Sequence, residues 1–152
     1  MNASDRLQEF IQGIQNYIEG KNLGPTKFNK DYRIAETYST EKLEKLTQDE
    51  CFNGAFLLYQ YADYINSEKA SQELVFNWCD KALNTIISTE IEDLPQYTRH
   101  EIKVAHILRS NDLAQKISDW KSVAEGRITA LGNKEYSVRK KADCLIEKGR
   151  RK

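Results

Sequence analysis

Apolar residues recur at steps of three and four along most of this chain, which is the pattern of helices that bury one face. The longest such stretch runs roughly from Gln48 to Ser88. Thr47 and Glu50 precede it with the spacing of a capping box, in which each side chain satisfies a free backbone N–H of the first turn. The pattern thins at residues 67–71, where either one long helix continues or a kink interrupts it.

A second long stretch carries apolar residues at similar steps as far as Leu131. Thr98 and Glu101 have the spacing of another capping box, so this helix is predicted to start there. Gly132-Asn133 is predicted to end it, because glycine and asparagine favour the backbone conformation that follows a helix. A shorter helix rich in Lys and Arg is expected in residues 134–152.

The N-terminal part predicts a shorter amphipathic helix that Asn2 or Ser4 caps and that ends near Gly20. Residues 20–39 show the least periodicity and mix basic with aromatic side chains. Such a loop can stack on bases and contact phosphates. It can equally act as a strap that packs its aromatic rings onto the helices, and for an isolated loop the strap is the favoured interpretation.

Composition agrees with a helical protein. Two prolines and seven glycines among 152 residues are too few for a turn-rich β fold. A short turn that begins at Ser39 or Thr40 is expected to join the loop to the long helix. We therefore predict an all-α fold of four or five helices, with two long antiparallel helices and a basic C-terminal helix, in a single domain spanning residues 1–152.

The net charge is zero, but the charges are divided along the chain. Residues 1–96 hold 9 Lys and Arg against 16 Asp and Glu, whereas residues 97–152 hold 14 against 7. This division indicates either a chain that binds an anion at one end or copies that stack head to tail. The alternative is that two oppositely charged faces pair within one molecule.

The sequence contains no catalytic motif. The two histidines, His100 and His106, lie six positions apart and point to different sides of a helix, unlike those of the HExxH zinc motif. Three widely spaced cysteines indicate buried free thiols in a reducing cytosol, not a disulfide framework. We expect a protein that is not an enzyme and that needs no cofactor or metal. A site assembled across subunits from His100, Glu101 or Asp119 is the weakest alternative.

The C-terminal segment carries the positive indication of function. Residues 134–152 contain eight basic residues against three acidic ones, more than complementing a helix dipole requires. Such a cluster favours phosphates through the release of counterions, and Tyr136 offers a platform on which a base can stack. The predicted nucleic-acid contacts are Lys134, Tyr136, Arg139, Lys140, Lys141, Arg150 and Arg151, with Lys27, Lys30 and Arg33 of the loop as a second group.

The segment Val123–Lys140, VAEGRITALGNKEYSVRK, resembles the C-terminal region of the UvsY-type recombination mediators of tailed phages. Those proteins show a helical face, then a basic residue, an aromatic residue, and a branched apolar and basic pair. Leu57–Ile65, LLYQYADYI, is similar to the aromatic central helix of the same family. The corresponding positions of the C-terminal pattern are occupied here by Lys134, Tyr136, Val138 and Arg139.

The resemblance implies a small helical protein that assembles into a homo-oligomeric ring and binds single-stranded DNA. It also implies contacts with a recombinase and with single-strand-binding protein, which such mediators help to exchange without breaking or making bonds. No apolar run reaches the roughly 20 residues of a membrane span, and no secretory signal is visible. A cytoplasmic location is therefore expected, in the host cytoplasm if a phage encodes the chain.

A rival hypothesis from another class is a protein–protein adaptor, for instance a phage-encoded inhibitor or assembly factor that binds a host protein. It would use the acidic, tyrosine-rich helix 48–66, and the basic tail would dock onto the chain's own acidic face. Salt-insensitive binding to a protein, with none to DNA, would identify that case.

Overall fold

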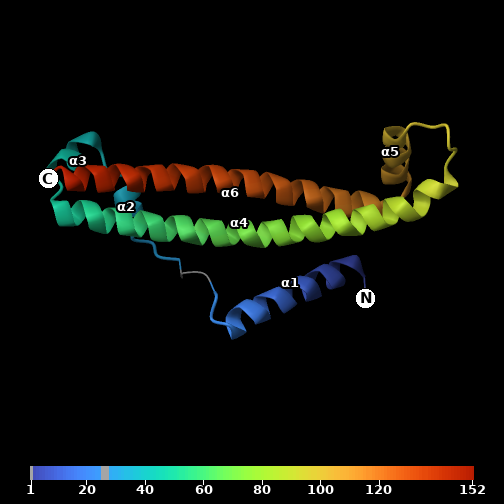
Figure 1. Cartoon of the computed structure of the whole chain (residues 1–152), viewed down its shortest axis with the longest axis horizontal. Coiled ribbons are helices and arrows are strands. Elements are labelled where there is room, and N and C mark those ends of the chain that lie inside the picture. Colours follow the sequence, from blue (N-terminus) through green and yellow to red (C-terminus); the bar gives the residue numbers. More distant parts are fainter. Residues whose placement is uncertain (1, 25–27) are drawn as a thin grey trace. The chain divides into compact units, whose positions relative to one another are not determined.

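The computed structural model describes residues 2–24 and 28–152 of the chain (Figure 1). Throughout these ranges the regular structure is helical, without a β-strand, so the predicted all-α class is confirmed. The described residues form six α-helices and one 3₁₀ turn where four or five helices were expected. In chain order they are α1 (Ala3–Gly20), α2 (Tyr32–Glu36), α3 (Thr40–Lys45), α4 (Gln48–Glu90), η1 (Ile91–Asp93), α5 (His100–Ser110) and α6 (Asp112–Arg150).

The chain divides into two compact units, and each unit is assembled from separate segments. Unit 1 holds the chain up to Ile18 together with Ser71–Ile128, and unit 2 holds Glu19–Ala70 together with Thr129–Lys152. The two long helices that the sequence predicted are α4, with 43 residues, and α6, with 39. Each of them contributes one segment to each unit, and α4 continues without a break through residues 67–71.

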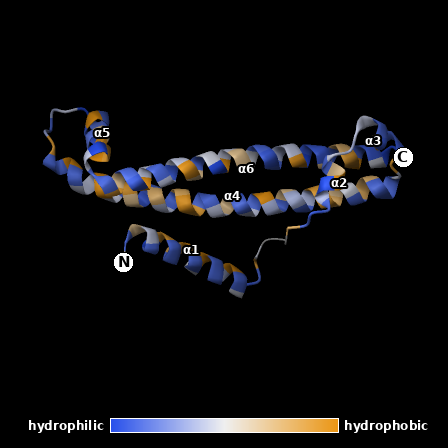
Figure 2. Cartoon of the chain, turned by 180° about the vertical axis from the view of Figure 1, so that it is seen from behind, coloured by the Kyte–Doolittle hydropathy of each residue, from blue (hydrophilic) through white to orange (hydrophobic). Residues whose placement is uncertain are grey.

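Unit 2 is built on an antiparallel pair, formed by the first part of α4 and the last part of α6 (Figure 1). Gln48 at the start of α4 donates from its side-chain amide to the backbone carbonyl of Gly149, whereas Lys69 further along pairs with Glu135. Apolar residues recur along both helices between hydrophilic ones (Figure 2). The buried core of this unit consists of Tyr32, Ala35, Leu46, Cys51, Ala55, Leu58, Ala62, Ile65, Val138, Ala142 and Leu145.

Unit 1 contains the other antiparallel segments of the same two helices. Lys121 of α6 pairs with Asp80 of α4 at 2.7 Å. The two tryptophans, Trp78 and Trp120, are partly buried and pack against the core, in agreement with the usual place of a large aromatic on an apolar stripe. The buried residues of this core are Cys79, Leu83, Ala114 and Ile117.

Local capping signals predicted the starts of α1 and α4 correctly, and the short turn expected at Ser39 or Thr40 is the helix α3. Thr47 and Glu50 form the expected reciprocal capping box, with N···O distances of 3.2 and 3.1 Å. The hydroxyl of Ser39 accepts from the backbone N–H of Lys42 and so begins α3. Asn2 caps α1 by accepting from the N–H of Asp5 at 2.9 Å. Each signal lies within one turn, so a sequence pattern suffices to find it.

The predicted start of the second long helix was wrong. A separate helix, α5, begins at His100 with Arg99 as its N-cap and no side-chain cap, so Thr98 and Glu101 form no capping box. The long helix starts only after Asn111, whose backbone is extended and whose side-chain oxygen accepts from the N–H of Ala114 at 3.0 Å. Asparagine competes in this way with helical hydrogen bonds and favours a cap.

The predicted helix end at Gly132-Asn133 was also wrong, because α6 continues through it to Arg150. A glycine inside a helix costs about 1 kcal/mol relative to alanine. The apolar face continues beyond it, with Val138 fully buried, and burying one such side chain contributes about 1.5–3 kcal/mol. Packing against α4 therefore outweighs the local signal. The basic segment is the last part of α6 and not a helix of its own.

Candidate nucleic-acid interface

The last part of α6 carries six of the ten predicted contacts, Arg151 directly follows it, and the burial of the helix decides which way the contacts on it point. Val138, Ala142 and Leu145 are buried against the core of unit 2. These positions repeat at steps of four and three, so they occupy one side of the helix. Side chains on the other sides border α4, the α2–α3 segment or solvent. Their position decides whether each cation pairs with a carboxylate or stays exposed.

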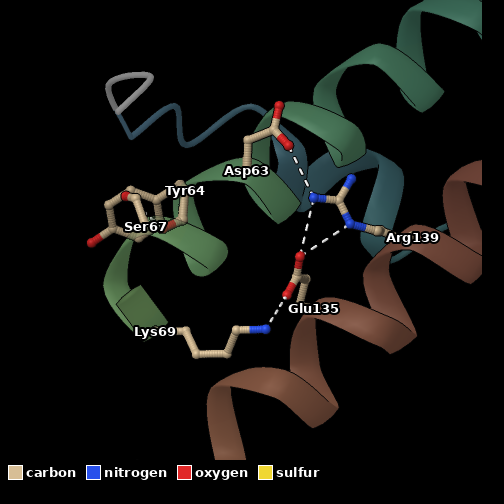
Figure 3. A network of polar contacts seen from close by, with 6 residues as sticks. All are labelled: Asp63, Tyr64, Ser67, Lys69, Glu135 and Arg139. Carbon is tan, nitrogen blue, oxygen red and sulfur yellow. Dashed lines mark hydrogen bonds and ion pairs between the residues drawn. The ribbon is translucent and has the colours of Figure 1, made fainter. Parts of the chain in front are cut away.

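Arg139 lies on the side that borders α4, where two carboxylates hold it (Figure 3). Its guanidinium contacts Asp63 at 3.0 Å and Glu135 at 3.1 Å. Lys69 of α4 also contacts Glu135, at 3.0 Å. The hydrogen bond to Asp63, helped by those to Glu135, raises the pKa of Arg139. This cation therefore links the two helices, and its charge is balanced within the fold.

Glu135 sits at the centre of that network, and its side chain is only 14% exposed. Burial raises the pKa of this carboxyl. The hydrogen bonds from Lys69 and Arg139 outweigh the burial and hold the pKa below its ordinary value of 4.5. The network is therefore a structural clamp that depends on an ionised glutamate.

Several other cations of this segment pair with carboxylates of unit 2. Lys134 contacts Glu36 at the end of α2. Lys148 contacts Glu44 of α3 at 2.5 Å, and Arg150 contacts Glu147 within α6 at 2.9 Å. The contacts of Lys134 and Lys148 match the interpretation in which oppositely charged faces pair within one molecule, whereas that of Arg150 lies within the basic segment itself.

Three of the predicted cations in the C-terminal segment have no carboxylate partner within the described ranges. They are Lys140, Lys141 and Arg151, and all three are exposed. Tyr136 is 66% exposed, and the ammonium of Lys140 lies 5.3 Å from the centre of its ring, within cation–π range. The exposed ring of Tyr136 thus shares the exposed sides of one helical segment with Lys140 and Lys141, and Arg151 follows the end of that helix.

The second group of predicted contacts lies in the segment before α3. Lys30 and Arg33 are exposed, whereas Lys27 lies outside the described residues. Two aromatic residues of this segment pack against tyrosines of α4. Tyr32 stacks on Tyr61 of α4 with ring centres 3.7 Å apart, and Phe28 lies 5.0 Å from Tyr64. The segment therefore packs against α4 as the strap that the sequence favoured, with Tyr32 buried, Phe28 42% exposed and Tyr38 lining a groove.

A groove of about 370 Å³ lies between the α2–α3 segment and the last part of α6, entirely within unit 2. Apolar side chains from α4, α6 and the α2–α3 segment line it, and three lysines border it. Cys144 also lines the groove and is exposed, which corrects the expectation of buried thiols, although Cys51 and Cys79 are buried. The lysines of the groove are Lys140, Lys141 and Lys148.

Sequence reasoning did not name Lys148 as a contact. Its signal was nevertheless present, because Lys140, Cys144 and Lys148 follow at steps of four and so lie along one side of a helix. That side is the border of the groove, where Lys148 is held by Glu44. The spacing predicts that these residues share one side of the helix. It does not predict the groove, because the α2–α3 segment forms the other wall.

The tyrosine-rich part of α4 is largely engaged inside unit 2. The hydroxyl of Tyr59 donates to Asp143 of α6, and Tyr61 is stacked on Tyr32. Burial, followed by a hydrogen bond with Tyr32, raises the pKa of Tyr61 to about 12. Phe56 is the large apolar side chain that this stretch exposes, at 67%. The adaptor hypothesis would have to rest on that residue and its polar neighbours.

His100 and His106 lie exposed on α5, in unit 1. No group of three or more His, Cys, Asp or Glu side chains capable of holding a metal ion occurs in the part of the chain that the structure describes. Within the same residues, no helix combines the length and apolar character that crossing a membrane requires.

Comparisons with models of known protein families, with curated proteins and with solved structures found no match to this chain.

Proposed function

We propose that this protein is a non-enzymatic accessory protein that binds single-stranded DNA through the exposed sides of α6 in unit 2. The observation that carries the proposal is a set of exposed groups, namely the ring of Tyr136 with Lys140 beside it, Lys141 on the same helical segment and Arg151 just after the end of α6. These available cations contact phosphates, and the ring of Tyr136 stacks on a base. Both interactions tolerate any base sequence.

The paired cations have a different role in this proposal. Arg139, Lys134 and Lys148 hold α6 against α4, α2 and α3, and so they fix the direction in which the available cations point. An ion pair between protein groups must be broken before its cation can replace a counterion on DNA. The available cations therefore contribute most of the salt-dependent affinity.

The mediator role belongs to the same proposal and is supported by the resemblance of Val123–Lys140 to the UvsY-type family. In that role the protein forms a homo-oligomer, contacts a recombinase and single-strand-binding protein, and helps the recombinase to load. A recombinase loading assay on a strand coated with single-strand-binding protein, with and without this protein, tests the role separately from DNA binding.

The DNA-binding proposal is tested by fluorescence anisotropy of a labelled single-stranded oligonucleotide at several salt concentrations. The test variant is Lys140→Ala/Lys141→Ala/Arg151→Ala. The matched control is Lys81→Ala/Lys116→Ala/Arg127→Ala, which removes three exposed cations from unit 1 and changes the net charge equally. Far-UV circular dichroism verifies that both variants remain helical.

Each phosphate contact contributes about 0.7 to the slope of log K against log salt on a single strand. Removing three contacts should therefore lower the slope by about 2, and the control should leave it unchanged. If both variants lose the same slope, only the net charge matters and the proposed surface is wrong. If the wild-type protein binds no strand at low salt, the DNA-binding function is wrong and the exposed part of α4 around Phe56 becomes the surface to examine for a protein partner.

A further inference from the structure

The groove beside α6 combines an apolar floor with a charged border. Its floor includes Leu58 of α4, Leu145 of α6, and Ala35 and Leu43 of the α2–α3 segment. Tyr38 adds an aromatic side chain to this lining. A volume of about 370 Å³ falls within the range of pockets that hold small organic groups. The groove is therefore suited to a flat or compact apolar body.

The border of the groove is polar and mostly positive. Lys140 and Lys141 approach it without carboxylate partners among the residues that the structure describes. Ser137 offers a hydroxyl, and Glu36 a carboxylate that is 18% exposed and paired with Lys134. A hydroxyl and a carboxylate can hydrogen-bond to the polar edge of a heterocycle. An aliphatic chain would form no hydrogen bond with either of them.

We propose that this groove receives one unstacked base of a bound single strand. The inference rests on the DNA-binding function proposed above. The base packs against Tyr38 and the leucine side chains, its polar edge meets Ser137 and Glu36, and the adjoining phosphates lie on Lys140 and Lys141. A base within a duplex cannot enter without being unpaired and unstacked, so the groove selects single strands.

Cys144 provides a direct measure of occupancy, because its exposed thiol lines the groove whereas the thiols of Cys51 and Cys79 are buried. The unmodified protein is treated with N-ethylmaleimide, and the alkylation rate of Cys144 is followed by mass spectrometry. Three ligands of equal length are compared, namely a base-bearing single strand, a strand of abasic tetrahydrofuran units with the same phosphates, and a duplex. Anisotropy gives the affinity of each ligand, so that each is used at about ten times its Kd.

At that concentration about nine-tenths of the sites are occupied, so the base-bearing strand should slow alkylation about tenfold. The abasic strand should bind through its phosphates and protect Cys144 much less. If all three ligands bind but protect equally or not at all, the groove holds no base although the DNA-binding function stands. If no ligand binds, the proposed function itself fails. Protection by decanoate with none by the base-bearing strand would assign the groove to an acyl chain and overturn the inference.

A variant that fills the groove gives a second readout. Ser137 is exposed at the border of the groove, so Ser137→Trp places a ring there without entering the core. We expect about tenfold weaker binding of the base-bearing strand and unchanged binding of the abasic strand. Asn133→Trp, at another exposed position of α6, is the matched control and should leave both affinities unchanged. Equal weakening of both strands by Ser137→Trp would contradict the base-accepting role.

Discussion

At Gly149, α6 approaches α4 closely enough that adding a single methyl group should affect stability. A Cβ atom built at Gly149 would lie 2.6 Å from Cε1 of Phe52 and 3.1 Å from Cβ of Cys51. Ordinary contacts between carbon atoms are about 3.5–4.0 Å. Because Cys51 Cβ is fixed by the helix backbone, Gly149→Ala must displace α6 or the Phe52 ring. Overpacking of this kind costs about 1–3 kcal/mol.

Gly126 of the same helix supplies the matched control. Nothing lies within 4 Å of a Cβ built there, so Gly126→Ala changes only the helix propensity. Replacing glycine by alanine inside a helix stabilises it by about 1 kcal/mol. Both variants make the same chemical change in α6, although Gly149 lies next to the end of the helix and gains less propensity. The difference between their free energies of unfolding therefore contains mainly the steric cost.

We expect Gly126→Ala to raise the free energy of unfolding by about 1 kcal/mol and Gly149→Ala to leave it unchanged or lower it by up to about 2 kcal/mol. Gly54→Ala should fall between them, since its Cβ would meet Leu145 Cδ1 at 3.2 Å, the end of a side chain that can yield. Urea unfolding followed by far-UV circular dichroism measures all three. Equal stabilisation by Gly149→Ala and Gly126→Ala would refute the close approach of the two helices.

Two further predictions concern ionisable groups. Because ion pairs lower the pKa of Glu135, its contribution is complete above its ordinary value of 4.5 and is lost as the pH falls through the lowered pKa. Glu135→Gln should therefore lower the free energy of unfolding by about 1–2 kcal/mol near neutral pH and by much less in acid. Urea unfolding at several pH values measures the difference between the variant and the wild type. A difference that does not change with pH would contradict the clamp. Tyr61, with a pKa of about 12, should be the last of the eight tyrosines to ionise in an alkaline absorbance titration. Tyr61→Phe should remove that component from the titration. The free energy of unfolding of the wild-type protein should fall as the pH rises from 10 towards 12, because Tyr61 loses its proton at a lower pH in the unfolded state than in the folded state. A late component that persists in Tyr61→Phe would contradict the assignment.

Helix existence was predictable wherever the signal was local. The α4 start at Thr47 and Glu50 and the α1 cap at Asn2 involve groups within three residues of each other. The break at Asn111 also had a sequence signal, since the apolar step from Leu108 to Leu113 is five residues and does not fit one helical face. Most other apolar steps in this stretch are three or four residues, so the single longer step was not interpreted as a break between two helices.

The division into two units was not predictable from any single pattern. α4 and α6 are each continuous, yet each supplies a segment to two separate cores. The membership of Ala62 in one core and of Cys79 in the other depends on which partner segment packs there. That choice is made by contacts between residues far apart in sequence.

The sequence by itself determined that the chain is helical and that its cations gather in the last part of α6, because spacing and composition are local properties. Only the tertiary structure decided which of those cations remain available. Lys134 is separated from Glu36 by 98 positions and Lys148 from Glu44 by 104, so pairing them required α2 and α3 to pack beside α6. The same packing left Lys140 and Lys141 at the border of a groove. Charge pairing acts through space, and the order of residues along a chain does not specify it.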